Sequence, residues 1–215
     1  MQPSIPLRII KLGGSLLSLD DLRSRFHTWL ETQPPARNLV VVGGGEAVEA
    51  IRALDVIHRF PAHLTHWICV DLMSVTAALA GELLGIGTPI STELELNAFM
   101  SGSTAISSIA CIQPTAYYTP SIVEQRRCNL PESWLCTSDS IAAWLANSLA
   151  ADQLVLLKSV EDQLKSNASL TAEAIRFLAD CGTVDPIFPQ ASQGLPDVRI
   201  VGLRNTTPAE RRITP

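Results

Sequence analysis

The sequence predicts an α/β fold with a mostly parallel central sheet that helices cover on both faces. Apolar runs typical of buried strands lie at 7–11, 39–42 and 154–158. Segments with helical spacing of apolar residues alternate with these runs along the chain. Strands that are apolar throughout favour a parallel sheet buried on both faces, and parallel neighbours need a crossover helix between them.

The first unit of this pattern is a strand, a glycine turn and a helix. Leu7–Lys11 is an apolar run that leads into Gly13-Gly14. Ser18 or Asp20 is a suitable cap for a helix that runs to about Thr32, because apolar residues recur there on one helical face.

The same unit occurs a second time. Leu39–Val42 is rich in β-branched residues, which favour a strand, and it leads into Gly43–Gly45. A helix is expected from Glu46 to about Arg59. His63–Leu84 is a second long helix that is apolar nearly all round, which predicts burial, in part at a subunit interface.

The second half of the chain is less regular. Residues 86–136 carry many Ser, Thr and turn prolines, with a strand candidate at Ile106–Ile112. A helix is expected after Cys136–Ser140, with Ile141, Leu145 and Leu149 on one face. The remaining expected elements are a strand at 154–158, a helix at 171–180 and a strand at 197–203. No linker or repeat separates these elements, so we expect one domain over 1–215.

Composition excludes several classes of protein. A hydrophobic fraction of 47% is too high for a disordered chain, and a net charge of −5 disfavours a nucleic-acid-binding protein, which needs a basic face. The five cysteines form no C-x-x-C pair, so we expect reduced thiols rather than disulfides or a zinc knuckle. The sequence has no signal-peptide pattern and no uninterrupted apolar run of the roughly 18–20 residues that a membrane span needs. We therefore expect a cytoplasmic protein without membrane partners.

Both glycine turns are candidate anion sites. Ligands of open parallel sheets bind at the carboxyl ends of strands, and glycines there let backbone N–H groups approach a ligand closely. A helix that follows adds free N–H groups and the positive end of its dipole. Lys11 directly precedes the first turn and adds a mobile positive charge, so the pair of sites suits phosphoryl transfer. The alternative is two tight turns without a ligand.

The common nucleotide-binding motifs do not fit. A G-x-G-x-x-G fingerprint that starts at Gly43 would place Val48 where close helix–strand packing needs a small residue. The P-loop pattern G-x-x-x-x-G-K-[ST] does not occur. An oxidoreductase is therefore the weakest functional alternative.

Asp139 is a further candidate residue, at the start of the helix expected after Cys136. The helix dipole favours a carboxylate there, so Asp139 is either an ordinary N-terminal acid or a group that holds Lys11 in place by a charge-assisted hydrogen bond.

Three segments, in this order, resemble the amino acid kinase superfamily, which includes acetylglutamate, uridylate and isopentenyl phosphate kinases. They are Ile10–Leu16 (IKLGGSL), Val41–Gly45 (VVGGG) and Thr137–Ala143 (TSDSIAA). The resemblance extends over nearly the whole chain. It implies a three-layer αβα sandwich and a small-molecule kinase that uses ATP and Mg²⁺, and we expect a homo-oligomer.

The resemblance also implies roles for residues of the two turns. Phosphates of ATP would be held by Lys11, Gly13, Gly14 and Ser15. The acceptor and the transferring group would be cradled by Gly43, Gly44 and Gly45. Asp139 would organise the lysines, and no residue is assigned as a metal ligand.

A narrower similarity concerns the small kinases that convert (aminomethyl)furan-methyl phosphate to its diphosphate in C1 metabolism. It rests on Ala62–Met73, Leu130–Trp134 and Thr183–Pro186. The chain departs from many relatives in a Val-Glu-Asp turn in place of Val-Asp-Gly, and in lacking a later Gly-Gly-Met-x-x-Lys segment with its second catalytic lysine. Lys158 or Lys165 can replace this lysine, and Lys158 is better placed, at the end of a strand.

Arg52 and His66 are the candidate acceptor contacts. Arg52 can pair bidentately with an acceptor phosphate, or it is a solvated helix arginine. His66 can hydrogen-bond a phosphate, or it is a satisfied, half-buried histidine. The main hypothesis is a kinase for a phosphate monoester or carboxylate. The departures from the family leave a non-catalytic nucleotide- or anion-binding subunit as the alternative.

Overall fold

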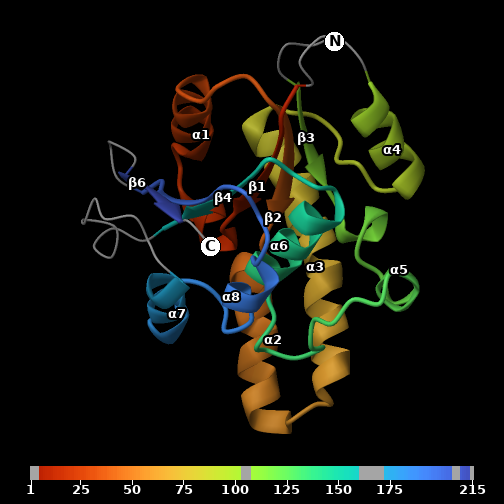
Figure 1. Ribbon diagram of the computed structural model, residues 1–215. Coiled ribbons are helices and arrows are strands. Elements are labelled where there is room, and N and C mark those ends of the chain that lie inside the picture. Colours follow the sequence, from red (N-terminus) through yellow and green to blue (C-terminus); the bar gives the residue numbers. More distant parts are fainter. Residues whose placement is uncertain (1–4, 103–107, 160–171, 205–208, 214–215) are drawn as a thin grey trace.

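The computed structural model describes residues 5–102, 108–159, 172–204 and 209–213. Its strands are β1 (Leu7–Leu12), β2 (Arg37–Val42), β3 (Ser108–Ile112), β4 (Gln153–Lys158), β5 (Val198–Gly202) and β6 (Ala209–Ile213). Its α-helices are α1 (Leu22–Glu31), α2 (Gly45–His58), α3 (Ala62–Leu84), α4 (Glu93–Ser101), α5 (Pro120–Gln125), α6 (Ser138–Ser148), α7 (Ala172–Asp180) and α8 (Phe188–Ala191). Two 3₁₀ helices, η1 (Gly14–Ser18) and η2 (Pro114–Ala116), complete the described elements (Figure 1).

The strands form one sheet in the order β3-β2-β1-β4-β5-β6. The first five are parallel to their neighbours, and β6 pairs antiparallel with β5 at the edge. The expected mostly parallel sheet is thus confirmed. Its centre is β1, so that β2 and β4 lie on either side of the strand that carries Lys11.

Alternating side chains of the strands build the two apolar layers, because successive residues of a strand point to opposite faces of the sheet. Ile10 and Leu12 of β1 belong to a buried cluster with residues of α1 and the C-terminal half of α3. Leu7 and Ile9 belong to a second cluster with residues of α6, α7 and α8. The three-layer αβα sandwich follows from this division.

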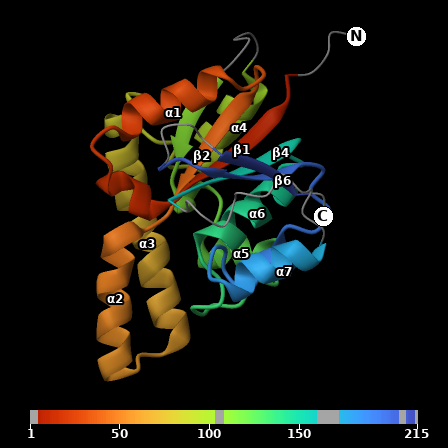
Figure 2. The same ribbon diagram turned by 90° about the vertical axis from the view of Figure 1, so that its left-hand side faces the viewer.

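Helices α2 and α3 run side by side and extend together beyond the sheet (Figures 1 and 2). The burial expected for the second of these helices is only partly right. Val70, Met73 and Leu84 are buried, but one stripe of the helix is exposed. That stripe consists of Leu64, Ile68, Val75, Leu79 and Leu83. By length and composition α3 resembles a membrane-spanning helix, but its buried side belongs to the two core clusters.

Several boundaries differ from those expected. The strand expected at 39–42 begins two residues earlier, at Arg37, and a 3₁₀ turn precedes α1, which begins only at Leu22. Of the candidate strand 106–112, the described part is β3. Helices α4 and α5 and the antiparallel strand β6 were not expected, because local turn signals in 86–136 and the charged residues of β6 hide their patterns.

Candidate active site

The two glycine turns meet at the carboxyl ends of β1 and β2. The Gly13 amide donates to the Leu157 carbonyl at 2.8 Å, and the Gly43 amide donates to the Leu12 carbonyl at 2.9 Å. A Cβ atom on Gly14 would lie 2.1 Å from the amide nitrogen of Gly45, so no side chain fits between the turns. Gly45 itself has φ of +56°, a left-handed conformation that favours glycine. The turns therefore form one continuous backbone surface.

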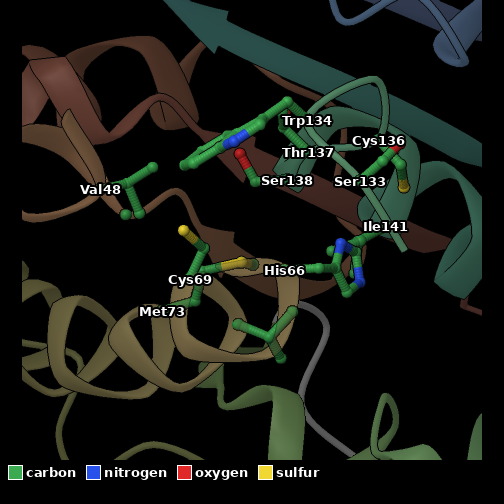
Figure 3. Close-up of a pocket in the computed structure, with 12 residues that line it drawn as sticks. Val48, His66, Cys69, Met73, Ser133, Trp134, Cys136, Thr137, Ser138 and Ile141 are labelled. Atoms are coloured by element: carbon green, nitrogen blue, oxygen red, sulfur yellow. The ribbon is translucent and has the colours of Figure 1, made fainter. Parts of the chain in front are cut away.

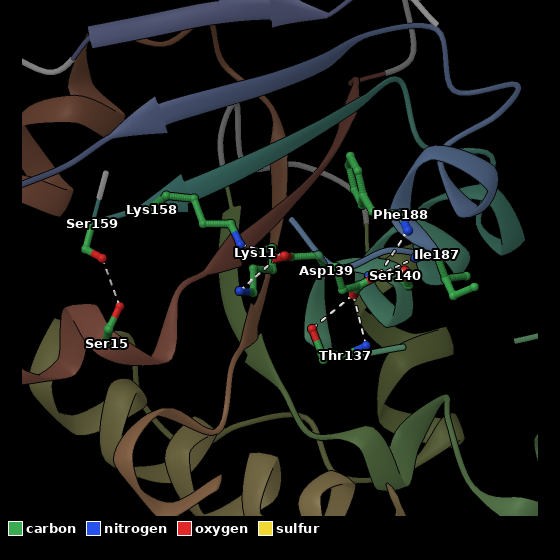
Figure 4. A network of polar contacts seen from close by, with 10 residues as sticks. Lys11, Ser15, Thr137, Asp139, Ser140, Lys158, Ser159, Ile187 and Phe188 are labelled. Carbon is green, nitrogen blue, oxygen red and sulfur yellow. Dashed lines mark hydrogen bonds and ion pairs between the residues drawn. The ribbon is translucent and has the colours of Figure 1, made fainter. Parts of the chain in front are cut away.

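Two lysines converge on one carboxylate beside this surface. Lys11 Nζ lies 2.8 Å from Asp139 Oδ1, and Lys158 Nζ lies 2.5 Å from Asp139 Oδ2 (Figure 4). Lys11 ends β1, Lys158 ends the neighbouring β4, and Asp139 stands in the first turn of α6. The exposed fractions of the three side chains are 6%, 13% and 4%, so the ion pairs are shielded from water.

The charges of this triad shift one another's pKa values. Burial raises the pKa of Asp139, but the attraction and hydrogen bonds of Lys11 and Lys158 outweigh burial and hold it at about 2. Burial, assisted by the charge of Lys11, lowers the pKa of Lys158 to about 8 despite the opposing effect of Asp139. Two ammonium groups and one carboxylate leave a net positive charge, which favours an anionic ligand.

Asp185 is a residue that the sequence analysis did not assign to the site. One of its oxygens accepts hydrogen bonds from the Thr137 amide and hydroxyl and from the Ser140 amide, at 2.9–3.0 Å. The other accepts from the Ser140 hydroxyl and from the amides of Ile187 and Phe188. This carboxylate ties the start of α6 to the segment before α8 and so positions Asp139. Its only sequence signal was its place in the Thr183–Pro186 segment.

A polar cleft of about 440 Å³ opens over these groups. Its lining includes most of the predicted site residues: Lys11, Gly14, Ser15, Gly43, Gly44, Gly45, Arg52, Asp139 and Lys158. Asp185 also contributes to the wall. The Ser15 and Ser159 hydroxyls lie 3.1 Å apart and link the first glycine turn to the end of β4 (Figure 4). The cleft thus combines backbone amides with two buried lysines.

Arg52 stands at the rim of the cleft. Its guanidinium group lies 4.1 Å from the ring centre of Trp134 and pairs with Glu49 at 3.2 Å. The Trp134 indole nitrogen donates to the Asp55 carboxylate at 2.6 Å. The cation–π contact and the ion pair restrain the guanidinium group while 41% of the side chain stays exposed, so Arg52 is not freely solvated.

His66 does not lie with Lys11 and Asp139. It lines a small, largely apolar chamber of about 50 Å³ beside the cleft (Figure 3). Its Nε2 lies 3.3 Å from the Tyr118 hydroxyl, and burial lowers its pKa. His66 is therefore a buried neutral imidazole with a protein partner. This agrees with the alternative of a satisfied histidine and not with a phosphate contact.

The arrangement fits a phosphorylated ligand. A Cβ on Gly43 would lie 2.9 Å from the Ser138 hydroxyl and 3.0 Å from the Gly14 amide nitrogen, so the absence of a side chain keeps this cradle open. Within the described residues, no three His, Cys, Asp or Glu side chains form a group that could hold a metal ion. Lys165 and the Val160-Glu161-Asp162 turn lie outside the described residues.

Residues 6–175 match the amino acid kinase family. The chain belongs to this family. Solved structures that it resembles include the UMP kinase from Ureaplasma parvum, at 12% identity and a TM-score of 0.62, covering 99% of this chain and 100% of that one. The uridylate kinase from Archaeoglobus fulgidus is 15% identical with a TM-score of 0.60, covering 98% and 100%. The aspartate kinase from Synechocystis is 16% identical with a TM-score of 0.62, covering 97% of this chain and 40% of that one. No curated protein sequence matches.

This amino acid kinase is accordingly a small-molecule phosphotransferase, and its family implies the use of ATP. At these sequence identities, the solved structures show the similarity of the fold alone. In this kinase the lysine that joins Lys11 on the aspartate comes from the end of β4, although the chain lacks the later Gly-Gly-Met-x-x-Lys segment.

Proposed function

We propose that this kinase transfers a phosphoryl group from MgATP to a small anionic acceptor, a phosphate monoester or a carboxylate. The observation that carries the proposal is the convergence of Lys11 and Lys158 on Asp139, beside two glycine turns in van der Waals contact. Phosphoryl transfer needs positioning and charge neutralisation more than covalent chemistry, and this arrangement supplies both.

Each group has a role in this proposal. The amides of Gly14 and Ser15 bind phosphates of the donor, whereas the Gly13 amide is held by the Leu157 carbonyl, so Gly13 shapes the turn. The second glycine turn, Gly43–Gly45, binds the acceptor. Lys11 and Lys158 neutralise charge on the transferring group. Asp139 holds both lysines in place and is therefore a positioning residue.

No general base is required, because the acceptor is already an anion at neutral pH. Mg²⁺ supplies further charge neutralisation when it is bound with ATP. Both oxygens of Asp139 already face lysines, and both oxygens of Asp185 already accept hydrogen bonds. Neither aspartate is thus free to hold the ion, and the carboxylates of the cleft that remain for it are Glu46 and Glu49, beside the phosphates of the nucleotide. The chemistry belongs in the cytoplasm, where ATP is available.

Arg52 is the acceptor-side arginine in this proposal. Its guanidinium group lies over the Trp134 ring at the rim, and a restrained guanidinium group suits bidentate binding of a phosphate or carboxylate. The acceptor that we favour, (aminomethyl)furan-methyl phosphate, would place its phosphate between this arginine and Gly43–Gly45 and leave as the diphosphate.

A homo-oligomer is proposed on separate grounds. Besides the apolar stripe of α3, the neighbouring helix α2 exposes Val56 and Ile57. So many exposed apolar side chains on two adjacent helices favour an interaction site, and a second copy of this chain is the partner that we propose.

The test is calorimetric titration of MgATP into the wild type, Lys11→Ala and Lys158→Met, followed by measurement of ADP release with candidate acceptors. Arg126→Ala serves as the control, because Arg126 lies on the surface in an ion pair with Glu93. We expect binding to the wild type and the control, with turnover reduced at least about 100-fold in both lysine variants. A folded wild type that binds no MgATP would instead support the non-catalytic binding subunit.

A further inference from the structure

The apolar chamber beside the cleft is the feature from which we infer the kind of acceptor. Gly44, Val48, Trp134, Thr137 and Ser138 line both the chamber and the cleft. An anion bound by the second glycine turn therefore sits at the mouth of the chamber. The rest of such a molecule has two directions to take, outward to water or inward to the chamber.

The inner wall of the chamber carries no formal charge. Helix α3 contributes Cys69, Val70 and Met73, and α6 contributes Ile141 (Figure 3). The adjoining cleft, in contrast, contains the buried lysines and carboxylates. This change from charged to apolar lining between two adjoining pockets that share a wall matches a ligand with an anionic end and an apolar end.

The polar groups of the chamber are also uncharged. Burial raises the pKa of the Cys69 thiol to about 11, and burial lowers the pKa of His66. The His66 ring is occupied by the Tyr118 hydroxyl, with the two rings edge to face at 6.0 Å. A charged or hydroxyl-rich group entering here would lose its water and find few free partners, which costs roughly 1–3 kcal/mol per unpaired group.

The size of the chamber sets a further limit. Its volume of about 50 Å³ is near a third of the roughly 150 Å³ that takes up a benzene molecule in a protein core. It admits a few non-hydrogen atoms, such as a short alkyl chain or the edge of a small ring. A nucleoside or a sugar does not fit, and of the acceptor favoured above only the edge of the furan ring fits, with the charged aminomethyl group left outside the chamber.

We propose that the acceptor of this kinase carries, next to its phosphate or carboxylate, a compact uncharged apolar group that enters this chamber, and that Cys69 and Met73 determine this specificity. That the ligand is a phosphoryl acceptor rests on the proposed function. That a ligand of this kind binds in the chamber does not depend on the proposed function.

The experiment compares two phosphate monoesters with the same three-carbon skeleton, propyl phosphate and glycerol 1-phosphate, by calorimetric titration. Inorganic phosphate is titrated in parallel to report on the anion site alone. We expect propyl phosphate to bind the wild type at least about tenfold more tightly, because the two hydroxyls of the other ester lack partners in the chamber.

Cys69→Leu fills the chamber, and Cys181→Leu makes the same change at an exposed cysteine as a control. We expect the preference for propyl phosphate to fall below about threefold in Cys69→Leu, with inorganic phosphate binding unchanged. Cys69→Ser keeps the volume and removes apolar character, so it serves as the second variant if Cys69→Leu does not fold. It should reduce the preference in the same direction.

Equal binding of the two esters to the wild type, failure of propyl phosphate to bind, or a preference that survives in both Cys69 variants would overturn the proposal. Titration of MgATP separates this result from the proposed function. Loss of the ester preference with intact MgATP binding refutes the chamber alone. A clear preference without MgATP binding refutes the kinase activity alone.

Discussion

Replacement of Asp139 by Asn removes the one negative charge that two buried lysines share, with little change in shape. Lys11 and Lys158 would then face each other's charge across a neutral amide, with exposed fractions of only 6% and 13%. Removal of one partner from a buried ion pair costs about 3–5 kcal/mol.

Proton release limits the part of this cost that comes from Lys158. Its pKa is about 8 with Asp139 present and falls further without that carboxylate, so loss of its proton at pH 7 costs at most about 1.4 kcal/mol. The remainder comes from Lys11 and from the lost charge-assisted hydrogen bonds. We therefore expect Asp139→Asn to lower the free energy of unfolding by about 3 kcal/mol at pH 7.

Urea unfolding of the wild type, Asp139→Asn, Lys158→Met and the double variant Asp139→Asn/Lys158→Met tests this reasoning as a double-mutant cycle. The double variant should recover at least half of the loss, because a neutral side chain then replaces one of the two unpaired charges. Stability of Asp139→Asn within about 0.5 kcal/mol of the wild type would refute the argument. So would a double variant that is no more stable than Asp139→Asn alone.

Three further predictions concern the same region. Gly14→Ala should weaken sulfate binding, measured by calorimetry, at least about tenfold, because its Cβ would push the two glycine turns apart. Gly102→Ala is the control and should leave sulfate binding unchanged, since a Cβ there meets nothing closer than 3.3 Å. Sulfate binding to the wild type should weaken by about tenfold as the pH rises through about 8, since Lys158 loses its charge there, and this step should be missing in Lys158→Met. Asp185→Asn should lower the free energy of unfolding by about 2 kcal/mol in urea, because an amide nitrogen cannot accept the hydrogen bonds of one carboxylate oxygen, whereas Asp180→Asn at an exposed position should be neutral. An unchanged Asp185→Asn would show that α6 does not need this carboxylate.

The elements most accurately predicted from the sequence are those with a strong local pattern. Leu39–Val42 and Leu154–Leu157 are apolar without interruption because both faces of their strands are buried, so their sequence alone reveals them. Helix α4 escaped prediction although it has a capping box of Thr92 and Glu95, because the surrounding segment shows no clear apolar period. Strand β6 escaped because its pattern, AERRI, has few apolar residues and its place depends on pairing with β5.

The residues of the candidate site also differ in whether a local sequence pattern reveals them. The glycine turns and Lys11 could be found because a strand followed by a glycine cluster is a contiguous signal. Asp185 could not, since its hydrogen bonds join segments more than forty residues apart and its own sequence context marks only a turn. The chamber could not be foreseen either. In the sequence, Cys69 and Met73 show the same apolar pattern as residues of α3 that are packed in the core and do not line the chamber.

By itself, the sequence determined the α/β class, the two glycine turns and the candidate lysines, because strand burial and glycine turns depend on residues adjacent in the chain. Only the tertiary structure decided that Lys158 shares Asp139 with Lys11, that Arg52 lies against Trp134, and that His66 lines the chamber rather than the cleft. The physical reason is the parallel sheet. It places β1 beside β2 and β4, whose sequence positions lie far apart, and so brings together at one edge side chains whose spacing along the chain carries no signal of their contact.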